Sequence, residues 1–437
     1  MNRVVSSVFA GIALVAQLFG PASMVSADDP ALVPTTVNTS PGPEYGDATR
    51  RFQGIPGIAR AAGGRLWATW YSGGSNEGPE NYVVVVTSSD DGGTWSPIRL
   101  VIDPPGAVRA FDPNLWVDPR GRLWLFYAQA YGWWDGRMGV WAVVTEEPDS
   151  PSPRWSVPRR IADGVMMNKP IVKRKGNWLL PIAVWSHEPR QDVPWDSSLH
   201  IPRDSLRWDP TKAGTHVYRS RDMGSTFELL GTARVPDVVS DEHMIVERKN
   251  GDLWMLVRTG STKRESGSLL GSSGISESVS VDNGRTWSPG TVSSIPHIPS
   301  RFFIRRLASG RLLLVKHNPR MDAAWLERAK VQEGWQRRSH LTAYLSNDDG
   351  KSWYGGLLLD DRLVVSYPDA VQAPDGRIFL VYDYNRKTDK EILLAVFTED
   401  DVNAGRLLNG RSRLRQVVNK ATGAAPSQAR STITNRN

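Results

Sequence analysis

The ionisable residues that could do chemistry in this chain recur at one place in a repeating pattern. Asp112, Lys169, Glu242, Arg301 and Tyr367 each stand seven to ten residues ahead of a glycine that opens an apolar, strand-like segment. Carboxylates and phenols can transfer protons or attack carbon, and Lys and Arg can bind an anionic substrate. A purely structural repeat does not need such groups in phase, although polar loop residues facing water are the alternative interpretation.

Those glycines belong to a unit that occurs six times. In each copy, Gly is followed by a polar or small residue and then by a hydrophobic strand. The six glycines, at spacings of 57, 55, 75, 59 and 66 residues, are Gly64, Gly121, Gly176, Gly251, Gly310 and Gly376. Because glycine takes positive φ without strain and β-forming residues flank it, each copy predicts a β-hairpin.

A second repeat, of the form S-x-D-x-G-x-T-W, is interleaved with the first. It occurs at 88–95 and recurs with small changes at 220–227, 280–287 and 346–353, and a degenerate copy ends at Trp155-Ser156. In such a turn, called an Asp box, Asp accepts backbone N–H bonds, Gly is left-handed and the aromatic packs between sheets. A carboxylate that recurs once per repeat is expected to be structural.

These repeats predict an all-β, six-bladed β-propeller with Asp-box turns. A β-sandwich would not keep a period of about 60 residues, and a helical solenoid needs a 3.6-residue period. The segments before the turn glycines should be the innermost strands, so their first residues should meet at one mouth of the central channel. We expect the ring to close where the strand near Phe52 joins the last blade near 394–397.

The composition of the two ends predicts the segment boundaries. An apolar run at 8–19 is followed by Val25 and Ala27 at the −3 and −1 places of a cleavage site, which indicates a signal peptide. An uncleaved anchor is the alternative, but the run is short for a membrane span. We expect a secreted or periplasmic protein with a signal peptide at 1–27, an N-terminal extension at 28–49, the propeller at 50–405 and a basic, disordered tail at 406–437.

Composition also argues against several kinds of site. The chain of 437 residues has no Cys and seven His, which excludes thiolate nucleophiles and Cys-based metal sites. We expect no cofactor and no catalytic metal. The net charge of +7 favours an anionic partner, but the basic residues are dispersed, so we expect no nucleic acid and, after signal removal, no membrane partner.

In its Asp boxes and in the ionisable residues ahead of the turn glycines, the chain resembles the sialidase (neuraminidase) superfamily over residues 50–400. Sialidases use a Tyr nucleophile, a Glu that activates it, an acid/base and three Arg residues that hold the substrate carboxylate. Tyr367, in Ser366-Tyr367-Pro368, matches the nucleophile, and Glu242 matches the activating carboxylate. A phenol suits this chemistry, because a carboxylate nucleophile would be repelled by the acid group on the anomeric carbon.

The resemblance assigns the remaining roles residue by residue. Glu77 stands where the family has its acid/base Asp, and a longer carboxylic acid can still protonate a leaving oxygen. Arg258 and Arg338 match two of the three carboxylate-binding Arg residues. Asp112, in Asp112-Pro113, matches a residue that reaches a substrate hydroxyl, and Asp383 matches the carboxylate that usually supports the first Arg.

One position departs from the family pattern. The first Arg stands in an R-I-P motif, whereas this chain has Gly54-Ile55-Pro56. Losing a bidentate Arg–carboxylate contact in a desolvated site should cost about 2–4 kcal/mol. We therefore expect another cation to approach Asp383 or the channel mouth, with Lys169 or Arg301 as the first candidates and Arg51 as the second.

Three functions remain open from the sequence. The first is a secreted retaining exo-glycosidase acting on a terminal acidic sugar of a glycan or glycoconjugate, sialic acid by resemblance. The second, motivated by Gly54, is a hydrolase or lyase for another acidic glycan that contains uronic acid. The third is a carbohydrate-binding propeller without catalysis, against which the Tyr367 and Glu242 pair argues, because binding alone does not need it.

Overall fold

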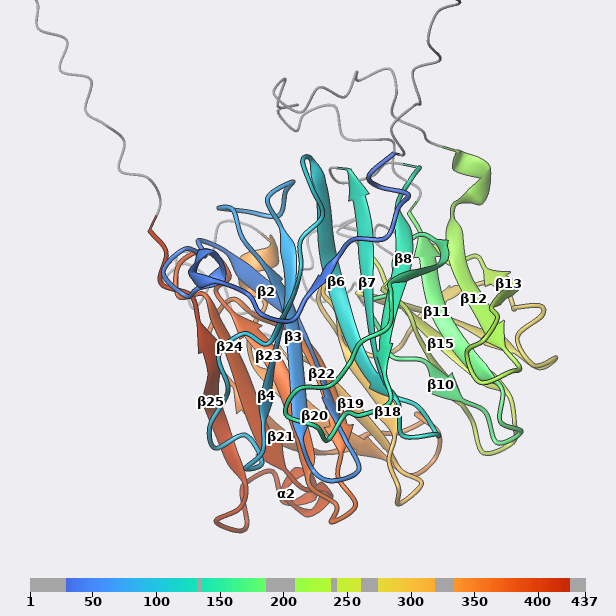
Figure 1. The fold of residues 1–437 in the computed structure, drawn as a ribbon. Helices are drawn as coiled ribbons and strands as arrows, with labels where there is room; N and C mark the ends of the chain where they lie inside the picture. The colour runs from blue at the N-terminus through green and yellow to red at the C-terminus, as the bar shows by residue number, and fades with distance from the viewer. Residues whose placement is uncertain are drawn as a thin grey trace, which may run out of the picture.

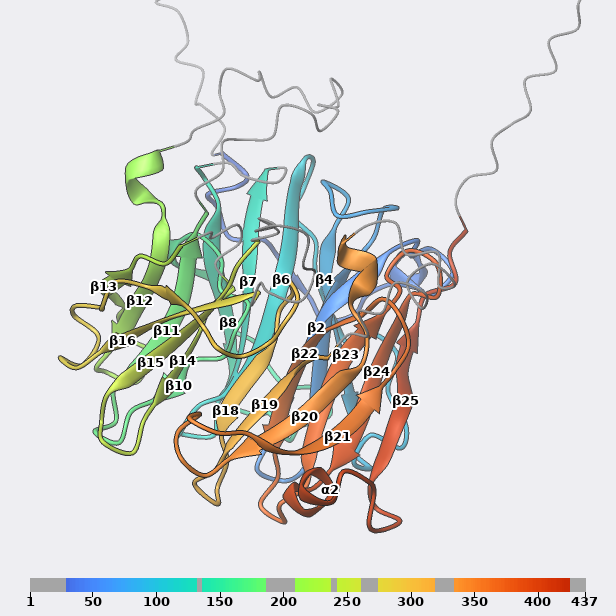
Figure 2. The same ribbon diagram turned by 180° about the vertical axis from the view of Figure 1, so that it is seen from behind.

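The strands form six antiparallel sheets around a central axis, and Figures 1 and 2 show these blades from opposite sides. The computed structural model describes residues 29–131, 136–185, 209–236, 242–260, 274–318 and 334–424. The predicted six-bladed, all-β propeller is confirmed. The predicted signal peptide at 1–27 lies outside the described residues.

Each blade is built from one continuous stretch of chain and is hydrogen-bonded in chain order. From the inner to the outer strand, the first three blades are β2 (Gln53–Arg60), β3 (Leu66–Ser72), β4 (Tyr82–Ser88) and β5 (Leu100–Ile102); β6 (Val108–Val117), β7 (Leu123–Tyr131), β8 (Gly139–Thr145) and β9 (Arg159–Asp163); and β10 (Ile171–Val172), β11 (Trp178–Val184), β12 (Gly214–Ser220) and β13 (Glu228–Ala233).

The remaining three blades follow the same order. They are β14 (Met244–Glu247), β15 (Leu253–Arg258), β16 (Ile275–Ser280) and β17 (Thr291–Val292); β18 (Phe303–Arg306), β19 (Leu312–His317), β20 (Leu341–Ser346) and β21 (Tyr354–Asp360); and β22 (Val365–Gln372), β23 (Ile378–Tyr384), β24 (Glu391–Phe397) and β25 (Arg413–Lys420). The short strand β1 (Val37–Asn38) extends the first blade beside β5. The helical segments described are η1 (Pro43–Tyr45), η4 (Pro210–Lys212), η5 (Gly334–Arg337) and α2 (Glu399–Ala404).

The Asp boxes are tight turns held by one repeated set of bonds. Ser88 Oγ donates to Asp90 at 2.7 Å, and the backbone N–H and hydroxyl of Thr94 donate to the same carboxylate at 2.9 and 2.7 Å. Bonds from Thr94 lower the pKa of Asp90 to about 2, so the carboxylate is charged at neutral pH. The structural role predicted for these Asp residues is therefore supported by their geometry.

The aromatic residue that ends each box lies at a seam between neighbouring blades. Trp95 packs against a core cluster that combines side chains of the first and last blades, and Trp287 packs against one that combines the third and fourth. Trp353 contacts the cluster that spans the fourth to sixth blades. All three indoles are partly buried, as predicted. Aromatic burial between sheets is thus what holds adjacent blades together.

Three inner strands each contain a β-bulge of the same kind, which changes the direction of one side chain. Ile55, Asp112 and Tyr367 have φ of 59°, 49° and 56°, and each is followed by proline. The pairing of β2, β6 and β22 with their neighbours shifts at these residues. A bulge accommodates a residue that lacks an N–H inside a strand and re-aims the side chain beside it. Positive φ at a non-glycine residue costs about 1–3 kcal/mol, which the surrounding packing must offset.

The ring closes differently from the prediction. We expected the strand near Phe52 to join the last blade, but β24 pairs with β23 and β25, and β2 is the inner strand of the first blade. Closure instead comes from packing of the first blade against the sixth and from bonds between the chain ends. Arg50, which is fully buried, donates to Asp47 at 2.5 Å and to Asn419 Oδ1 at 2.6 Å.

The predicted boundary at 405 is also wrong. Residues 413–420 are not a tail but form β25, the outer strand of the last blade, with Val418 and Ala421 buried. The sequence here is basic and polar because an outer strand faces solvent on one side, so composition concealed it. Residues 425–437 lie outside the described residues. Among the helices described, none is long and apolar enough to cross a membrane.

Removing β25 should destabilise the propeller. We expect a chain ending at residue 411 to have a free energy of unfolding at least about 2 kcal/mol below that of a chain ending at 424, because burying a single Val side chain contributes about that much. Urea unfolding followed by far-UV circular dichroism measures the difference. Identical unfolding curves for the two chains would contradict the assignment of 413–420 to the last blade.

Candidate active site

Tyr367, Glu242 and Arg258 meet at the channel mouth in one hydrogen-bonded group. The Tyr367 hydroxyl donates to Glu242 Oε1 at 2.7 Å, and Arg258 Nη1 donates to the same hydroxyl at 2.8 Å. Arg258 Nη1 also forms an ion pair with Glu242 Oε1. The contact that activation of Tyr367 by Glu242 requires is therefore present. The bulge in β22 aims the phenol at β14, and Arg258 reaches it from the end of β15.

The surroundings of Tyr367 set its protonation state. Only 4% of the residue is exposed, and burial raises the pKa of its hydroxyl to about 12, while the nearby Arg258 lowers it and Glu242 raises it. The phenol is therefore neutral at pH 7. It can attack only if a base takes its proton during the reaction, and Glu242 is the acceptor already bonded to it. Glu242 Oε2 is buried and has no hydrogen-bond partner among the described residues.

Two further guanidinium groups lie over the Tyr367 ring. The guanidinium carbon of Arg338 lies 5.5 Å from the ring centroid, and that of Arg386 lies 4.3 Å from it. Arg338 Nη2 donates to the carbonyl of Pro299 at 3.3 Å, and burial lowers the pKa of Arg338 to about 10. Three arginines, Arg258, Arg338 and Arg386, thus surround the phenol, and all remain positively charged at pH 7.

Arg386 is the residue that the sequence reasoning missed. It stands on the turn between β23 and β24, and its backbone carbonyl accepts from Gln53 N at 3.2 Å. Its Nε donates to Asp383 Oδ2 at 2.8 Å, and its Nη2 donates to Ser366 Oγ at 3.1 Å. Asp383, predicted to support the first Arg of the family, therefore does support an arginine, but one that comes from three residues further along the chain.

The absence of a side chain at Gly54 makes room for this arginine. A Cβ atom at residue 54 would lie 2.5 Å from Arg386 Cδ and 2.7 Å from its Nε. The aliphatic part of Arg386 thus occupies the space into which a side chain at 54 would grow. Gly54 thus leaves room for Arg386. Arg386 places a guanidinium beside Asp383, although it does not stand at the position of the missing arginine of the R-I-P motif.

The cations that we expected to replace the missing arginine lie elsewhere. Lys169 forms an ion pair with Asp369, and Arg301 Nη2 lies 3.6 Å from the same carboxylate. Arg51 Nη2 lies 3.4 Å from Glu80 near the surface. None of the three approaches Asp383, because Lys169 and Arg301 are held by Asp369 and Arg51 by Glu80, so the expectation that one of them pairs with Asp383 is wrong.

Two acidic residues face the group from the first two blades. Glu77, on the loop between β3 and β4, accepts from Arg386 Nη1 at 3.0 Å. Asp112, 3% exposed, makes no hydrogen bond among the described residues, and the charges of Glu77 and Glu242 act on it. Burial raises the pKa of Asp112 to about 8, against the lowering effect of the Arg109 charge and with smaller raising effects from those two carboxylates, so Asp112 is largely protonated at pH 7. It can then donate a hydrogen bond.

The signal that could have revealed Arg386 is its short separation from Asp383 along the sequence. Sequence reasoning looked for cations at the starts of inner strands, whereas Arg386 follows Asp383 by three residues, in a turn where Asn385 and Lys390 have φ of 45° and 52°. That turn brings the chain back over Gly54. Among the residues that the structure describes, no group of three or more His, Asp or Glu is placed to hold a metal ion.

Comparison with known proteins agrees with the fold. The model of the BNR repeat-like domain family matches residues 64–380. A Hadza microbial sialidase shares 18% identity with a TM-score of 0.58, over 82% of this chain and 68% of that one. The intramolecular trans-sialidase of Ruminococcus gnavus shares 13% identity with a TM-score of 0.56, over 82% of this chain and 97% of that one.

A third solved structure is a Dyadobacter fermentans protein of unknown function, with 17% identity and a TM-score of 0.54 over 78% of this chain and 92% of that one. No curated protein sequence matches the chain. At identities this low, the solved structures show a shared fold.

Filling the space at Gly54 should displace Arg386. We expect Gly54→Ala to lower the free energy of unfolding by at least about 2 kcal/mol, because Arg386 must leave the buried Asp383. In an Arg386→Ala background, the same Gly54→Ala change should cost much less. Urea unfolding of the four proteins gives both costs. Equal costs in the two backgrounds would show that the two positions are not coupled.

The raised pKa of Asp112 predicts an effect of pH on stability. Between about pH 4 and 8 the folded state keeps a proton that the unfolded state has lost, so this residue makes the parent less stable as pH rises through that window. The difference in unfolding free energy between Asp112→Asn and the parent should therefore grow in favour of the variant from pH 5 to 8. Asp282→Asn, at an exposed Asp box, is the control and should show no such trend. A constant difference for Asp112→Asn would contradict the assignment.

Proposed function

The chain belongs to the BNR repeat-like family of sialidase-like propellers, and on this premise we propose that it is a secreted exo-glycosidase that hydrolyses a terminal acidic sugar, sialic acid first. The observation that supports the proposal is the hydrogen bond from the Tyr367 hydroxyl to Glu242, with three arginine side chains around the phenol. A carbohydrate-binding site without catalysis would not need a buried phenol bonded to a carboxylate.

The proposed reaction begins with attack by Tyr367 on the anomeric carbon. Glu242 takes the phenol proton as the new carbon–oxygen bond forms, and the bond to the leaving group breaks. A second carboxylic acid protonates the leaving oxygen. Water then attacks the anomeric carbon and gives its proton to the second carboxylate, while the bond to Tyr367 breaks and Glu242 returns the phenol proton, so that the sugar is hydrolysed with net retention.

The three arginines are proposed to bind the acid group of the sugar. Arg258 and Arg338 offer guanidinium groups beside the phenol, and Arg386 supplies the third from the turn after β23. Planar guanidinium groups match the geometry of a carboxylate better than ammonium groups do. Binding by arginines from three blades would hold the sugar ring in the orientation that the attack requires.

Two residues are candidates for the acid. By resemblance the acid is Glu77, which is ion-paired with Arg386. Asp112 is the one that burial keeps protonated. We assign the leaving-group proton to Glu77 and a hydrogen bond to a substrate hydroxyl to Asp112.

The test is hydrolysis of a fluorogenic sialoside beside a panel of glycans that contain uronic acid. We expect turnover of the sialoside, a fall of at least about a thousandfold in kcat for Tyr367→Phe, and a fall of about 30- to 1000-fold in kcat/KM for Arg386→Ala, the effect of losing about 2–4 kcal/mol of carboxylate binding. Turnover of uronic-acid glycans alone would support the second function, and binding without turnover the third.

The same assay separates the two acids. A fluorogenic phenol leaves without much help, whereas a sugar hydroxyl needs a proton. Glu77→Gln should therefore lose more activity on a sialyl disaccharide than on the fluorogenic substrate, and Asp112→Asn should lose similar amounts on both. The opposite result would exchange the two roles.

A further inference from the structure

A second polar cluster and a cavity lie along the channel away from Tyr367. The inner strands all run in the same direction, because each is the first strand of its blade. Tyr367 stands near the start of β22, whereas Asp369 lies further along and Gln372 ends it. Residues at the ends of these strands therefore meet at the opposite mouth of the channel.

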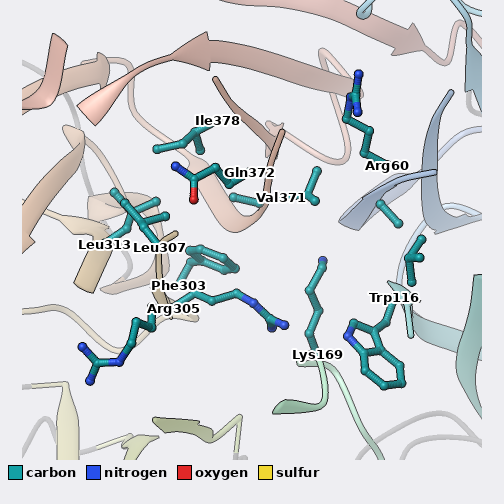
Figure 3. A pocket seen from close by; sticks show the side chains of 14 residues that line it. Arg60, Trp116, Lys169, Phe303, Arg305, Leu307, Leu313, Val371, Gln372 and Ile378 are labelled. Carbon is teal, nitrogen blue, oxygen red and sulfur yellow. The ribbon is translucent and has the colours of Figure 1, made fainter. Parts of the chain in front are cut away.

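A cavity of about 240 Å³ lies at that opposite mouth. Its lining combines apolar side chains, among them Trp116 from β6 and Phe303 from β18, each only 4% exposed, with the cationic side chains of Arg60, Lys169, Arg305 and Arg306. Figure 3 shows the side chains of Lys169 and Arg305 extending into the same space between these walls. No residue of the Tyr367 group lines this cavity.

Positive charge exceeds negative charge around this cavity. Asp369 is the carboxylate on which three cations act, namely Lys169, Arg301 and Arg305. Lys169 and Arg301 contact Asp369, but within the described part of the chain Arg305 has no carboxylate within ion-pair distance. Its one hydrogen bond to a described residue goes from Nη1 to the carbonyl of Pro170 at 3.3 Å. The guanidinium of Arg305 is therefore a partly buried cation that is only partly compensated.

The neighbouring Arg306, in the same strand, has a carboxylate partner that Arg305 lacks among the described residues. Arg306 Nη2 donates to Asp349 at 2.6 Å and to the carbonyl of Glu247 at 2.9 Å. Partly buried charges are costly unless they are paired, and Arg305 has a pairing position open toward the cavity. An anionic ligand in the cavity would complete it.

We propose that this cavity is a binding site for a small organic carboxylate with a flat, apolar body. The carboxylate pairs with Arg305 beside Lys169, and the body lies between Trp116 and Phe303. A planar carboxylate matches a guanidinium in geometry, and a fully hydrophilic anion such as phosphate would leave the apolar walls without contacts. This site is separate from the proposed glycosidase site and does not depend on it.

The test is binding of benzoate, measured by isothermal titration calorimetry at fixed ionic strength. Benzamide, a neutral molecule of the same shape, and inorganic phosphate are the ligand controls. We expect benzoate to bind the parent protein, and benzamide and phosphate to bind at least about tenfold more weakly, since one charge-assisted pair contributes about that factor or more. Equal binding of benzamide would show an apolar cavity without anion selectivity and would overturn the proposal, as would equal or tighter binding of phosphate.

Variants locate the bound benzoate. Arg305→Gln should weaken benzoate binding at least about tenfold. Arg306 also lines the cavity, but its guanidinium is already paired with Asp349, so Arg306→Gln, the matched control, should leave the affinity within about twofold. Val371→Phe, which fills the cavity without removing a charge, should also abolish binding. If either Arg305→Gln or Val371→Phe bound benzoate as the parent does, the proposal would be wrong.

The arginines around Tyr367 could also bind a carboxylate, so a third variant separates the two sites. Arg338→Gln should keep the benzoate affinity of the parent, and Arg305→Gln should keep its turnover of a fluorogenic sialoside. Weakening of benzoate by Arg338→Gln alone would place the ligand at the Tyr367 group and overturn the proposal. Absence of sialoside turnover in every protein would count against the proposed function and leave the result for benzoate to stand by itself.

Discussion

Charges buried in a narrow channel must be paired, and this requirement organises the interior of the propeller. Six inner strands converge on one axis, and five of them carry, near their first residues, ionisable side chains that have little access to water. Each pairing fixes a position: Arg386 is held by Asp383, Arg258 by Glu242, and Lys169 by Asp369. Removing one partner would leave an uncompensated charge, which is costly in such surroundings. The arrangement of the candidate site follows from these pairs as much as from the backbone.

Most of the architecture could be predicted from the repeats, because a turn that recurs six times gives the sequence a regular spacing of the same residues. The glycines after the inner strands and the Asp boxes each have a local physical cause, so the blade number and the inner strands could be predicted from them. The pairing of Tyr367 with Glu242 could be predicted as well, because both start an inner strand and so converge on the axis.

The errors came from features with no local pattern. Arg386 is brought to Gly54 by a turn whose conformation depends on positive φ at Asn385 and Lys390, and nothing in the spacing of the repeats marks it. The strand β25 has only one buried residue, Val418, among many polar side chains, so its composition resembles that of a tail. Closure of the ring by bonds between residues near Arg50 and Asn419 depends on contacts across almost the whole chain. Each of these is decided by tertiary structure rather than by propensity.

The position of Arg386 on a surface turn has a consequence for how such a protein can diversify. An arginine on an inner strand is tied to the core of its blade, and moving it would disturb the packing of six sheets. An arginine on the turn between β23 and β24 can be shifted, lost or regained by inserting or deleting a few loop residues, while the blades remain unchanged. Selection for a new ligand would then act on the length of one loop, and chains with the same scaffold could differ in the ligand they accept without any change in their cores.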